Sequence, residues 1–467
     1  MNEPNHTPDK TQSPPPPMTY HRIAASWWPL ALSWLLMSAE GPAHSAIVSR
    51  LANPEINLAA WGGIVFPISL IMEAPVVMML SASTALSTNW RSYTKLRRIA
   101  IITGVVFTAL HGLIAFTPLY GWVTRTIIGA PEEILEPGRL GLMIMTPWTL
   151  AIAYRRFQQG AMIRFGHSKA VGTGTAIRLA ANGVILLGGY LLKRVPGIVV
   201  AATAVATGVI AEALYAGLRI RPISRQQIRS APRVETPFTF KHFLRFYIPL
   251  ALTSLITFFI SPIGSASMSR LPRALSSLAV WPVISGFIFL TRSPCLAYNE
   301  VVVALLDEPR SYTRLKRFAG ILGFASTVLI LIIVATPLAE IWMRDVMALP
   351  SDLLPMATPA VWFTVPLPLL ALVRSWFQGI LVNHRETRAI TEAVVLNLVT
   401  FVIIAGVSVM TQPTAGLYVV LLGQGIAGLI QSLWLWLRSK TNVKQLEAGS
   451  EAGPTSHPTS KISTQRT

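Results

Sequence analysis

Long apolar runs, separated by short polar or basic segments, dominate the pattern of the chain. Because a helix rises about 1.5 Å per residue, about 20 apolar residues cross the ~30 Å hydrocarbon core of a bilayer. The pattern therefore predicts about twelve spanning helices and an all-α fold. We expect the helices near residues 24–48, 58–87, 96–120, 138–163, 169–192, 197–219, 243–268, 276–306, 316–340, 356–382, 388–410 and 414–437.

Several short motifs recur in the same order at a spacing of about 220 residues, as expected for a duplicated unit. The basic run that begins at Arg91 returns almost unchanged at Arg310, and Ser49-Arg50-Leu51 returns as Ser269-Arg270-Leu271. Each half contains an even number of predicted helices, so the second half starts on the same side of the membrane as the first. The sequence thus predicts two parallel six-helix repeats.

The composition places these helices in a membrane. Hydrophobic residues make up 52% of the 467 residues and charged residues only 13%, which is too apolar for a soluble enzyme of this length. The net charge of +19 is concentrated between the apolar runs, and this placement favours positive-inside orientation over nucleic-acid binding. The sole cysteine, Cys295, excludes an intrachain disulfide.

The charges of the loops predict the orientation. Basic loops follow the second, fourth and sixth helices, whereas Glu132, Glu133 and Glu136 lie in an intervening loop. Lys and Arg favour the cytoplasmic side. We therefore expect a multi-pass protein of the plasma (inner) membrane with both termini in the cytoplasm. The expected domains are a disordered tail at 1–20, an N-lobe at 21–219, a basic linker at 220–242, a C-lobe at 243–437 and a disordered tail at 438–467.

Three stretches resemble known transporter families. Residues 155–170, RRFQQGAMIRFGHSKA, are similar to the turn after the fourth helix of multidrug-and-toxin-extrusion (MATE) transporters, which share a superfamily with polysaccharide and lipid II flippases. Residues 110–122 and 246–252 resemble, more narrowly, the progressive ankylosis proteins, a branch of this fold linked to export of pyrophosphate and related anions. The resemblance implies a V-shaped carrier whose central cavity opens alternately to the two sides of the membrane.

Ionisable side chains inside a membrane cost several kcal/mol unless they pair or face water, so each one is a functional candidate. Glu73 and Arg292 occupy equivalent positions of the two repeats, each shortly before a proline. Their equivalence predicts a substrate or gating pair that faces the cavity between the lobes. A structural ion pair, or separate pairing within each lobe, is the alternative.

A second pair of equivalent motifs carries arginine and glutamine. Arg155 and Gln159 lie on one helical face, and Arg374 and Gln378 repeat the arrangement. Two such faces that meet between the lobes would form a cationic surface suited to phosphate or carboxylate. Alternatively, these arginines reach toward the membrane interface or bind lipid headgroups.

Glu40 and His44 are the candidates for ion coupling. Removal from water disfavours the charged form of a carboxylate, so Glu40 could take up and release protons with His44 as neighbour or relay. The resemblance to MATE proteins, in which an acidic residue of the first helix takes part in cation coupling, implies the same role. A carboxylate bonded to local donors at a helix break is the alternative. Arg178, in the fifth helix, is a further candidate for the cavity, and Glu212 is a weaker one.

These features together predict a secondary-active transporter that works by alternating access. It would export an organic or phosphate-containing anion, driven by a proton or cation (sodium) gradient. The alternatives are a multidrug cation antiporter of the MATE type, a flippase of lipid-linked substrates and, outside transport, a membrane scaffold. The sequence offers no metal-ligand spacing and no phosphate loop of the ATPase kind, so we expect no enzyme activity, metal or cofactor. The expected partners are the bilayer and a small anion, with no nucleic acid, for a monomeric chain.

Overall fold

Helices make up most of the chain in the computed structural model, which describes residues 18–232, 239–308 and 311–451. The N-lobe contains α1 (Tyr20–Ser38), α2 (Glu40–Ser49), α3 (Pro54–Ala60), η1 (Trp61–Val65), α4 (Phe66–Val77), α5 (Met79–Leu86), α6 (Trp90–Phe116), α7 (Leu119–Gly121), η2 (Trp122–Ile128), η3 (Glu132–Ile134), α8 (Leu135–Met145), α9 (Trp148–Arg164), α10 (Ser168–Leu192), α11 (Gly197–Ile223) and η4 (Ser224–Ile228). The C-lobe contains α12 (Phe240–Arg270), α13 (Ala274–Leu296), α14 (Tyr298–Leu305), α15 (Ser311–Ala335), α16 (Leu338–Ile341), η5 (Trp342–Val346), α17 (Leu354–Ala360), η6 (Val361–Thr364), α18 (Leu367–Asn383), α19 (Thr387–Thr411) and α20 (Gly416–Glu451).

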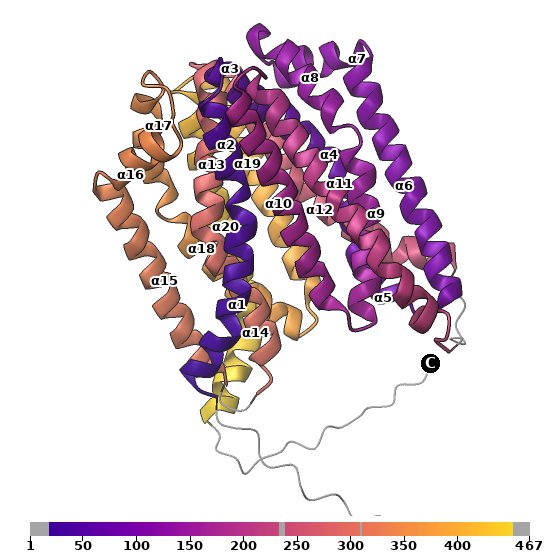
Figure 1. Ribbon diagram of the computed structural model, residues 1–467. Coiled ribbons are helices and arrows are strands. Elements are labelled where there is room, and N and C mark those ends of the chain that lie inside the picture. Colours follow the sequence, from indigo (N-terminus) through magenta and orange to yellow (C-terminus); the bar gives the residue numbers. More distant parts are fainter. Residues whose placement is uncertain (1–17, 233–238, 309–310, 452–467) are drawn as a thin grey trace, which may run out of the picture.

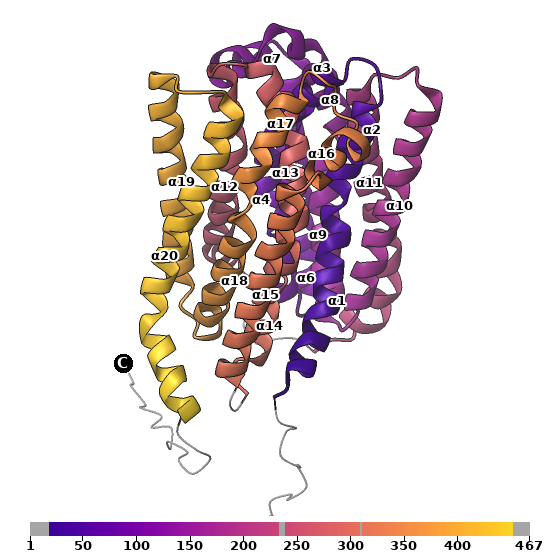
Figure 2. The same cartoon turned by 90° about the vertical axis from the view of Figure 1, so that its left-hand side faces the viewer.

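The long helices run side by side through one bundle (Figures 1 and 2). The start of α1 and the end of α20 lie at the same end of the bundle, which we call the terminal face. The elements α3, α7, α8 and α17 lie at the opposite end, which we call the distal face (Figure 1). The described chain therefore crosses the bundle an even number of times, as the alternating loops predicted.

Consecutive elements join into segments that match the predicted helices in order. In the described residues, 10 segments are long and apolar enough to cross a membrane, and the segments α1–α2 and α8–α9, interrupted near Ala39 and Thr146, complete the set. Prolines lie beside two further interruptions, because α4 ends just after Pro75 and α13 just after Pro294. The described chain is thus helical and multi-pass, and the membrane segments of its two halves follow one another in the same order.

The last helix is longer than the apolar pattern predicted. α20 continues to Glu451, beyond the expected end of the C-lobe at residue 437. Val443 and Leu446 pack against the apolar cluster around the start of α14, and Lys316 forms a 3.0 Å ion pair with Glu447. The first part of the predicted tail is therefore helical, because these contacts hold a segment that is too polar to be read as a membrane span.

The predicted linker is also partly helical. α11 runs to Ile223 and continues through η4 to Ile228, whose side chain is buried against the N-lobe. Arg229 at the end of this extension lies 4.5 Å from the ring centroid of Trp90, which fixes it against the start of α6. Arg233 and Arg310, which belong to the predicted basic loops, lie outside the described residues.

The helices α9 and α18 lie at equivalent central positions of the two lobes. In the N-lobe α9 contacts α5, α6 and α11, and in the C-lobe α18 contacts α14, α15 and α20. Gly160 and Gly379 permit this packing. A Cβ at position 160 would lie 2.3 Å from the carbonyl oxygen of Leu80, and one at position 379 would lie 2.6 Å from Cγ1 of Val302. These glycines directly follow Gln159 and Gln378 of the equivalent arginine and glutamine motifs.

We expect Gly160→Ala to lower the melting temperature of the purified protein. The new Cβ would overlap a backbone oxygen at 2.3 Å, so α5 or α9 must shift, at a cost of roughly 1–3 kcal/mol. Gly172→Ala in α10 is the matched control, because a Cβ there meets no described atom within 4 Å. Thermal unfolding in detergent compares the two variants, and equal melting temperatures would contradict the role of Gly160.

The first helix of each lobe packs on the opposite lobe. α1 contacts α13 of the C-lobe, and α12 contacts α4 of the N-lobe. Two hydrogen bonds join these pairs: Nε1 of Trp27 donates to the Pro294 carbonyl oxygen at 2.9 Å, and the Tyr247 hydroxyl donates to the Pro75 carbonyl oxygen. Both acceptors lie next to the breaks at which α13 and α4 end. Equivalent positions of the two repeats thus make equivalent contacts between the lobes.

Candidate functional site

A buried network of opposite charges lies inside the N-lobe. Arg155 of α9 forms an ion pair with Glu212 of α11, and the side-chain amide of Gln159 donates to the other Glu212 oxygen at 2.8 Å. The side chain of Glu212 is only 1% exposed and that of Arg155 only 7%. The four-residue spacing on α9 turns both Arg155 and Gln159 toward α11. The charge of Arg155 is therefore neutralised within the lobe.

Arg178 of α10 extends this network to α2. Its Nη2 lies 3.1 Å from the Glu40 carboxylate, and its Nε lies 3.5 Å from that of Glu212. Asn182, one turn along α10, donates to the other Glu40 oxygen at 2.6 Å, and Nδ1 of His44 lies 2.6 Å from the Glu40 carbonyl oxygen. The structure thus brings together Glu40, His44 and Arg178, three of the residues predicted for ion coupling or the cavity.

Glu73 of α4 completes the charges of the N-lobe. Its side chain is buried and interacts electrostatically with three arginines. The interaction with Arg156 is the strongest, followed by those with Arg155 and Arg178. The described cluster therefore contains as many carboxylates as arginines. The carboxylates are those of Glu40, Glu73 and Glu212, and the guanidinium groups are those of Arg155, Arg156 and Arg178. The negative and positive charges of this N-lobe cluster are therefore equal in number.

The C-lobe contains a cavity of about 520 Å³ among α12, α13, α18, α19 and α20, with Leu70 of α4 contributing a wall from the N-lobe. Arg292 and Arg374 are the charged residues among the described residues that line it, and none of these lining residues is acidic. Nη1 of Arg374 donates to the side-chain oxygen of Gln431 at 3.0 Å. In the described part of the chain, Nε of Arg292 is buried without a hydrogen-bond partner.

Neutral polar and apolar side chains form the rest of this cavity, which we call the C-lobe cavity. The polar side chains offer amide and hydroxyl groups next to the two arginines. The apolar side chains include one aromatic ring each from α12, α13 and α19. The polar group consists of Thr257, Ser261, Ser285, Ser375, Gln378, Asn397, Gln424 and Gln431, and the apolar group includes Phe258, Trp281, Ile288 and Phe401. The cavity thus combines two positive charges with hydrogen-bonding groups and an apolar wall.

The two lobes differ at the position that bonds the arginine of α9 or α18, and this difference determines the net charge around that arginine. Arg155 bonds Glu212 and Arg374 bonds Gln431, and the partner lies 57 residues after the arginine in both pairs. The carboxylate of Glu212 cancels the positive charge of its arginine, whereas the amide of Gln431 leaves that charge in place. The same fold therefore encloses a neutral cluster in one lobe and a cationic cavity in the other.

Glu73 and Arg292 do not form the pair that their equivalence suggested. Glu73 interacts with the arginines of the N-lobe, whereas Arg292 lines the C-lobe cavity. The alternative of separate pairing within each lobe describes Glu73, whereas no acidic residue lies beside Arg292 among the described residues that line its cavity. Glu73 lies on α4, which contacts α9 of its own lobe, and Arg292 lies on α13, which contacts α18 of its own lobe.

The single cationic surface expected from both arginine motifs does not form either. Arg155 and Gln159 bind Glu212, while Arg292, Arg374 and Gln378 line the C-lobe cavity. Sequence reasoning underrated Glu212 and overlooked Gln431. The repeat offered a signal for both, because they lie at equivalent distances after equivalent arginines.

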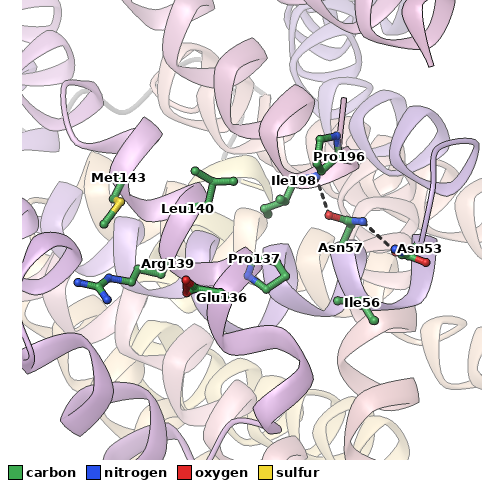
Figure 3. A pocket seen from close by; sticks show the side chains of 10 residues that line it. All are labelled: Asn53, Ile56, Asn57, Glu136, Pro137, Arg139, Leu140, Met143, Pro196 and Ile198. Atoms are coloured by element: carbon green, nitrogen blue, oxygen red, sulfur yellow. Dashed lines mark hydrogen bonds between the residues drawn. The ribbon is translucent and has the colours of Figure 1, made fainter. Parts of the chain in front are cut away.

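A second cavity, of about 440 Å³, opens near α3 and α8 at the distal face (Figure 3). Two of its polar side chains have partners: Asn57 donates to the Asn53 carbonyl oxygen and accepts from the Ile198 amide, and Arg139 donates to the Ala115 carbonyl oxygen. Figure 3 shows Asn57 between Asn53 and Ile198, joined to them by these bonds. The cavity is also lined by Glu136, so it has one acidic and one basic side chain and differs in charge from the C-lobe cavity.

No protein-family model matches the chain, and no curated protein is similar enough in sequence to match it. Solved structures match its fold. A lipid II flippase MurJ in an inward closed conformation has a TM-score of 0.70 at 17% identity, covering 92% of this chain and 91% of that one. A multidrug resistance MATE family transporter of the MOP superfamily in an inward-facing conformation has a TM-score of 0.65 at 16% identity, covering 91% and 99%. An outward-facing MATE family transporter has a TM-score of 0.59 at 17% identity, covering 91% and 97%.

These likenesses confirm the predicted fold over almost the whole chain. At such low identity they concern the architecture, and the narrower resemblance to progressive ankylosis proteins stays a prediction. The chain has the fold that MATE family transporters of the MOP superfamily share with the lipid II flippase MurJ.

Proposed function

We propose that this protein is a secondary-active transporter that binds an organic anion in the C-lobe cavity and moves it by alternating access. The observation that carries the proposal is the pair of arginines, Arg292 and Arg374, in a cavity without an acidic lining residue among those described. A buried positive charge costs several kcal/mol unless an opposite charge compensates it. A bound carboxylate or phosphate would supply that charge.

The size and walls of the cavity support an amphipathic anion. Its volume of about 520 Å³ lies within the range of pockets that hold drug-sized molecules, and is far larger than an inorganic anion needs. Guanidinium groups bind carboxylates and phosphates through paired hydrogen bonds. The rings of Phe258 and Trp281 would contact an apolar body attached to that head group. A cationic substrate would face two like charges in this site.

The N-lobe network supports a role in coupling to protons. Glu40 shares Arg178 with Glu212 and is partly accessible, with 16% of its side chain exposed. Protonation of Glu40 would break its ion pair with Arg178 and leave Glu212 as the remaining carboxylate partner of that arginine. The network would then change between two arrangements of charge, as a coupling site requires.

We expect proteoliposomes that contain the protein to take up an aromatic carboxylate or phosphate faster than pyrophosphate, citrate or a cationic dye. An imposed pH gradient should accelerate this flux in the wild type. In Glu40→Gln the downhill flux should persist but lose its response to the gradient, because the variant cannot release a proton. Dye flux without anion flux would overturn the anion site. A full pH response in Glu40→Gln would remove Glu40 from the coupling mechanism and leave the anion site untouched.

A further inference from the structure

At the distal face, two arginines each donate hydrogen bonds to backbone carbonyl oxygens of the opposite lobe. Arg50, at the end of α2 in the N-lobe, donates through Nη2 to the Asp345 carbonyl oxygen at 2.8 Å and through Nη1 to the Val346 carbonyl oxygen at 3.0 Å. These carbonyls end η5 of the C-lobe. A single side chain of the N-lobe thus holds the end of a short C-lobe helix.

The C-lobe makes the reciprocal contact. Arg270, at the end of α12, donates through Nη1 to the Ile128 carbonyl oxygen at 2.6 Å, and through Nη2 to those of Ile127 and Thr126 at 2.7 and 2.9 Å. These carbonyls end η2 of the N-lobe. Each arginine also donates to a carbonyl oxygen of its own helix, Arg50 to that of Ala46 and Arg270 to that of Ala266.

Both contacts come from the repeated motif Ser-Arg-Leu. Arg50 and Arg270 are its central residues in the two repeats, and η2 and η5 begin at Trp122 and Trp342, within one residue of equivalent positions. The last carbonyls of a helix have no partner within the helix and carry partial negative charge. A planar guanidinium can bind several of them at once.

Each short helix also carries an arginine, at equivalent positions, that forms a local ion pair. Arg125 of η2 donates to both carboxylate oxygens of Glu132, at 2.8 and 2.9 Å, and these bonds lower the pKa of the Glu132 carboxyl. Arg344 of η5 lies 3.1 Å from Glu340 and 3.2 Å from Asp345. The acceptors of Arg50 and Arg270 belong to helices of the opposite lobe, so these contacts must break if the lobes separate at the distal face.

We propose that Arg50 and Arg270 are paired latches that hold the distal face closed, and that their release opens the transporter to that side. The hydrogen bonds from Trp27 and Tyr247 to the Pro294 and Pro75 carbonyls form the opposite pair, toward the terminal face. By the distribution of basic loops the distal face is the external one. The inference rests on the alternating access in the proposed function, but not on the substrate.

The test measures how fast a buried cysteine on the lobe contact reacts with a membrane-impermeant maleimide. Ser265→Cys in a Cys295→Ser background places one thiol at a buried site of α12, where the serine donates to the Gly62 carbonyl oxygen of the N-lobe at 3.2 Å. The reagent is applied from the distal side of oriented proteoliposomes, without substrate. The readout is accessibility, so a failure of the anion proposal leaves this test intact.

Arg50→Ala with Arg270→Ala should raise the labelling rate at least roughly tenfold, because a tenfold change needs the loss of only about one charged hydrogen bond. Arg50→Lys with Arg270→Lys keeps the charges but loses the planar fork, and should give a smaller increase. Trp27→Phe with Tyr247→Phe is the control, and should leave labelling unchanged or slower because it weakens the opposite pair. Unchanged labelling in the double alanine variant, or an equal increase in the aromatic control, would overturn the latches.

Discussion

Gln431→Glu is expected to reduce anion transport roughly 100-fold, equivalent to ~2.7 kcal/mol of lost stabilisation. The N-lobe shows why, because the equivalent carboxylate, Glu212, forms an ion pair with Arg155. A carboxylate at position 431 would bind Arg374, which already donates to this side chain at 3.0 Å. The substrate would then compete with a permanent internal anion. Initial rates of uptake over a range of anion concentrations give kcat/KM for the comparison.

Gln431→Leu separates charge from hydrogen bonding. It loses the same bond to Arg374 but leaves both positive charges of the cavity in place. We expect its kcat/KM to stay within roughly tenfold of the wild type, the equivalent of ~1.4 kcal/mol. An equal loss in the leucine and glutamate variants would assign the effect to the position of Arg374 and contradict the charge argument. Melting temperatures of both variants show whether the fold has survived.

Glu212→Gln should destabilise the N-lobe by roughly 3–5 kcal/mol, the cost typical of removing one member of a buried ion pair. Arg155 would keep its charge with only 7% of its side chain exposed, and Arg178 would lose one of its two carboxylate partners. The expected result is a lower melting temperature in detergent and a lower yield of folded protein.

The double variant Arg155→Met, Glu212→Gln tests the cause of this loss. It removes the unpaired charge and fills the space of the arginine with an apolar side chain, so it should recover most of the lost stability. If the double variant is as unstable as Glu212→Gln alone, the carboxylate is needed for a reason other than the charge of Arg155. Wild-type stability of the single variant would show that water reaches Arg155.

The apolar runs and the repeat predicted the helices and their order, because a membrane imposes a minimum length on each crossing. The prediction failed for helical residues that are stabilised by contacts with other parts of the protein and not by the bilayer. Residues 438–451 are polar enough to suggest a tail, yet Lys316 and an apolar cluster hold them in α20. The number of apolar residues needed to cross a bilayer says nothing about how far a helix continues outside the membrane, where side-chain contacts stabilise it.

Most residues of the candidate site, Gln431 excepted, were predictable from the sequence, but their pairing was not. Arg155 and Arg374 stand in identical motifs, so sequence reasoning gave them the same role. Their roles differ because of Glu212 and Gln431, each on another helix 57 residues away. Helical spacing identifies neighbours within one helix only, and pairs between helices depend on packing.

If the protein carries an anion as proposed, the uncompensated charge of the C-lobe cavity should also make transport sensitive to voltage. When the lobes rock without substrate, Arg292 and Arg374 move positive charge through part of the membrane's electric field, whereas a bound dianion would cancel that movement. A full elementary charge moved through 100 mV changes the free energy by about 2.3 kcal/mol. The membrane potential therefore acts chiefly on the return of the empty carrier, and the balanced charges of the N-lobe contribute little to this effect.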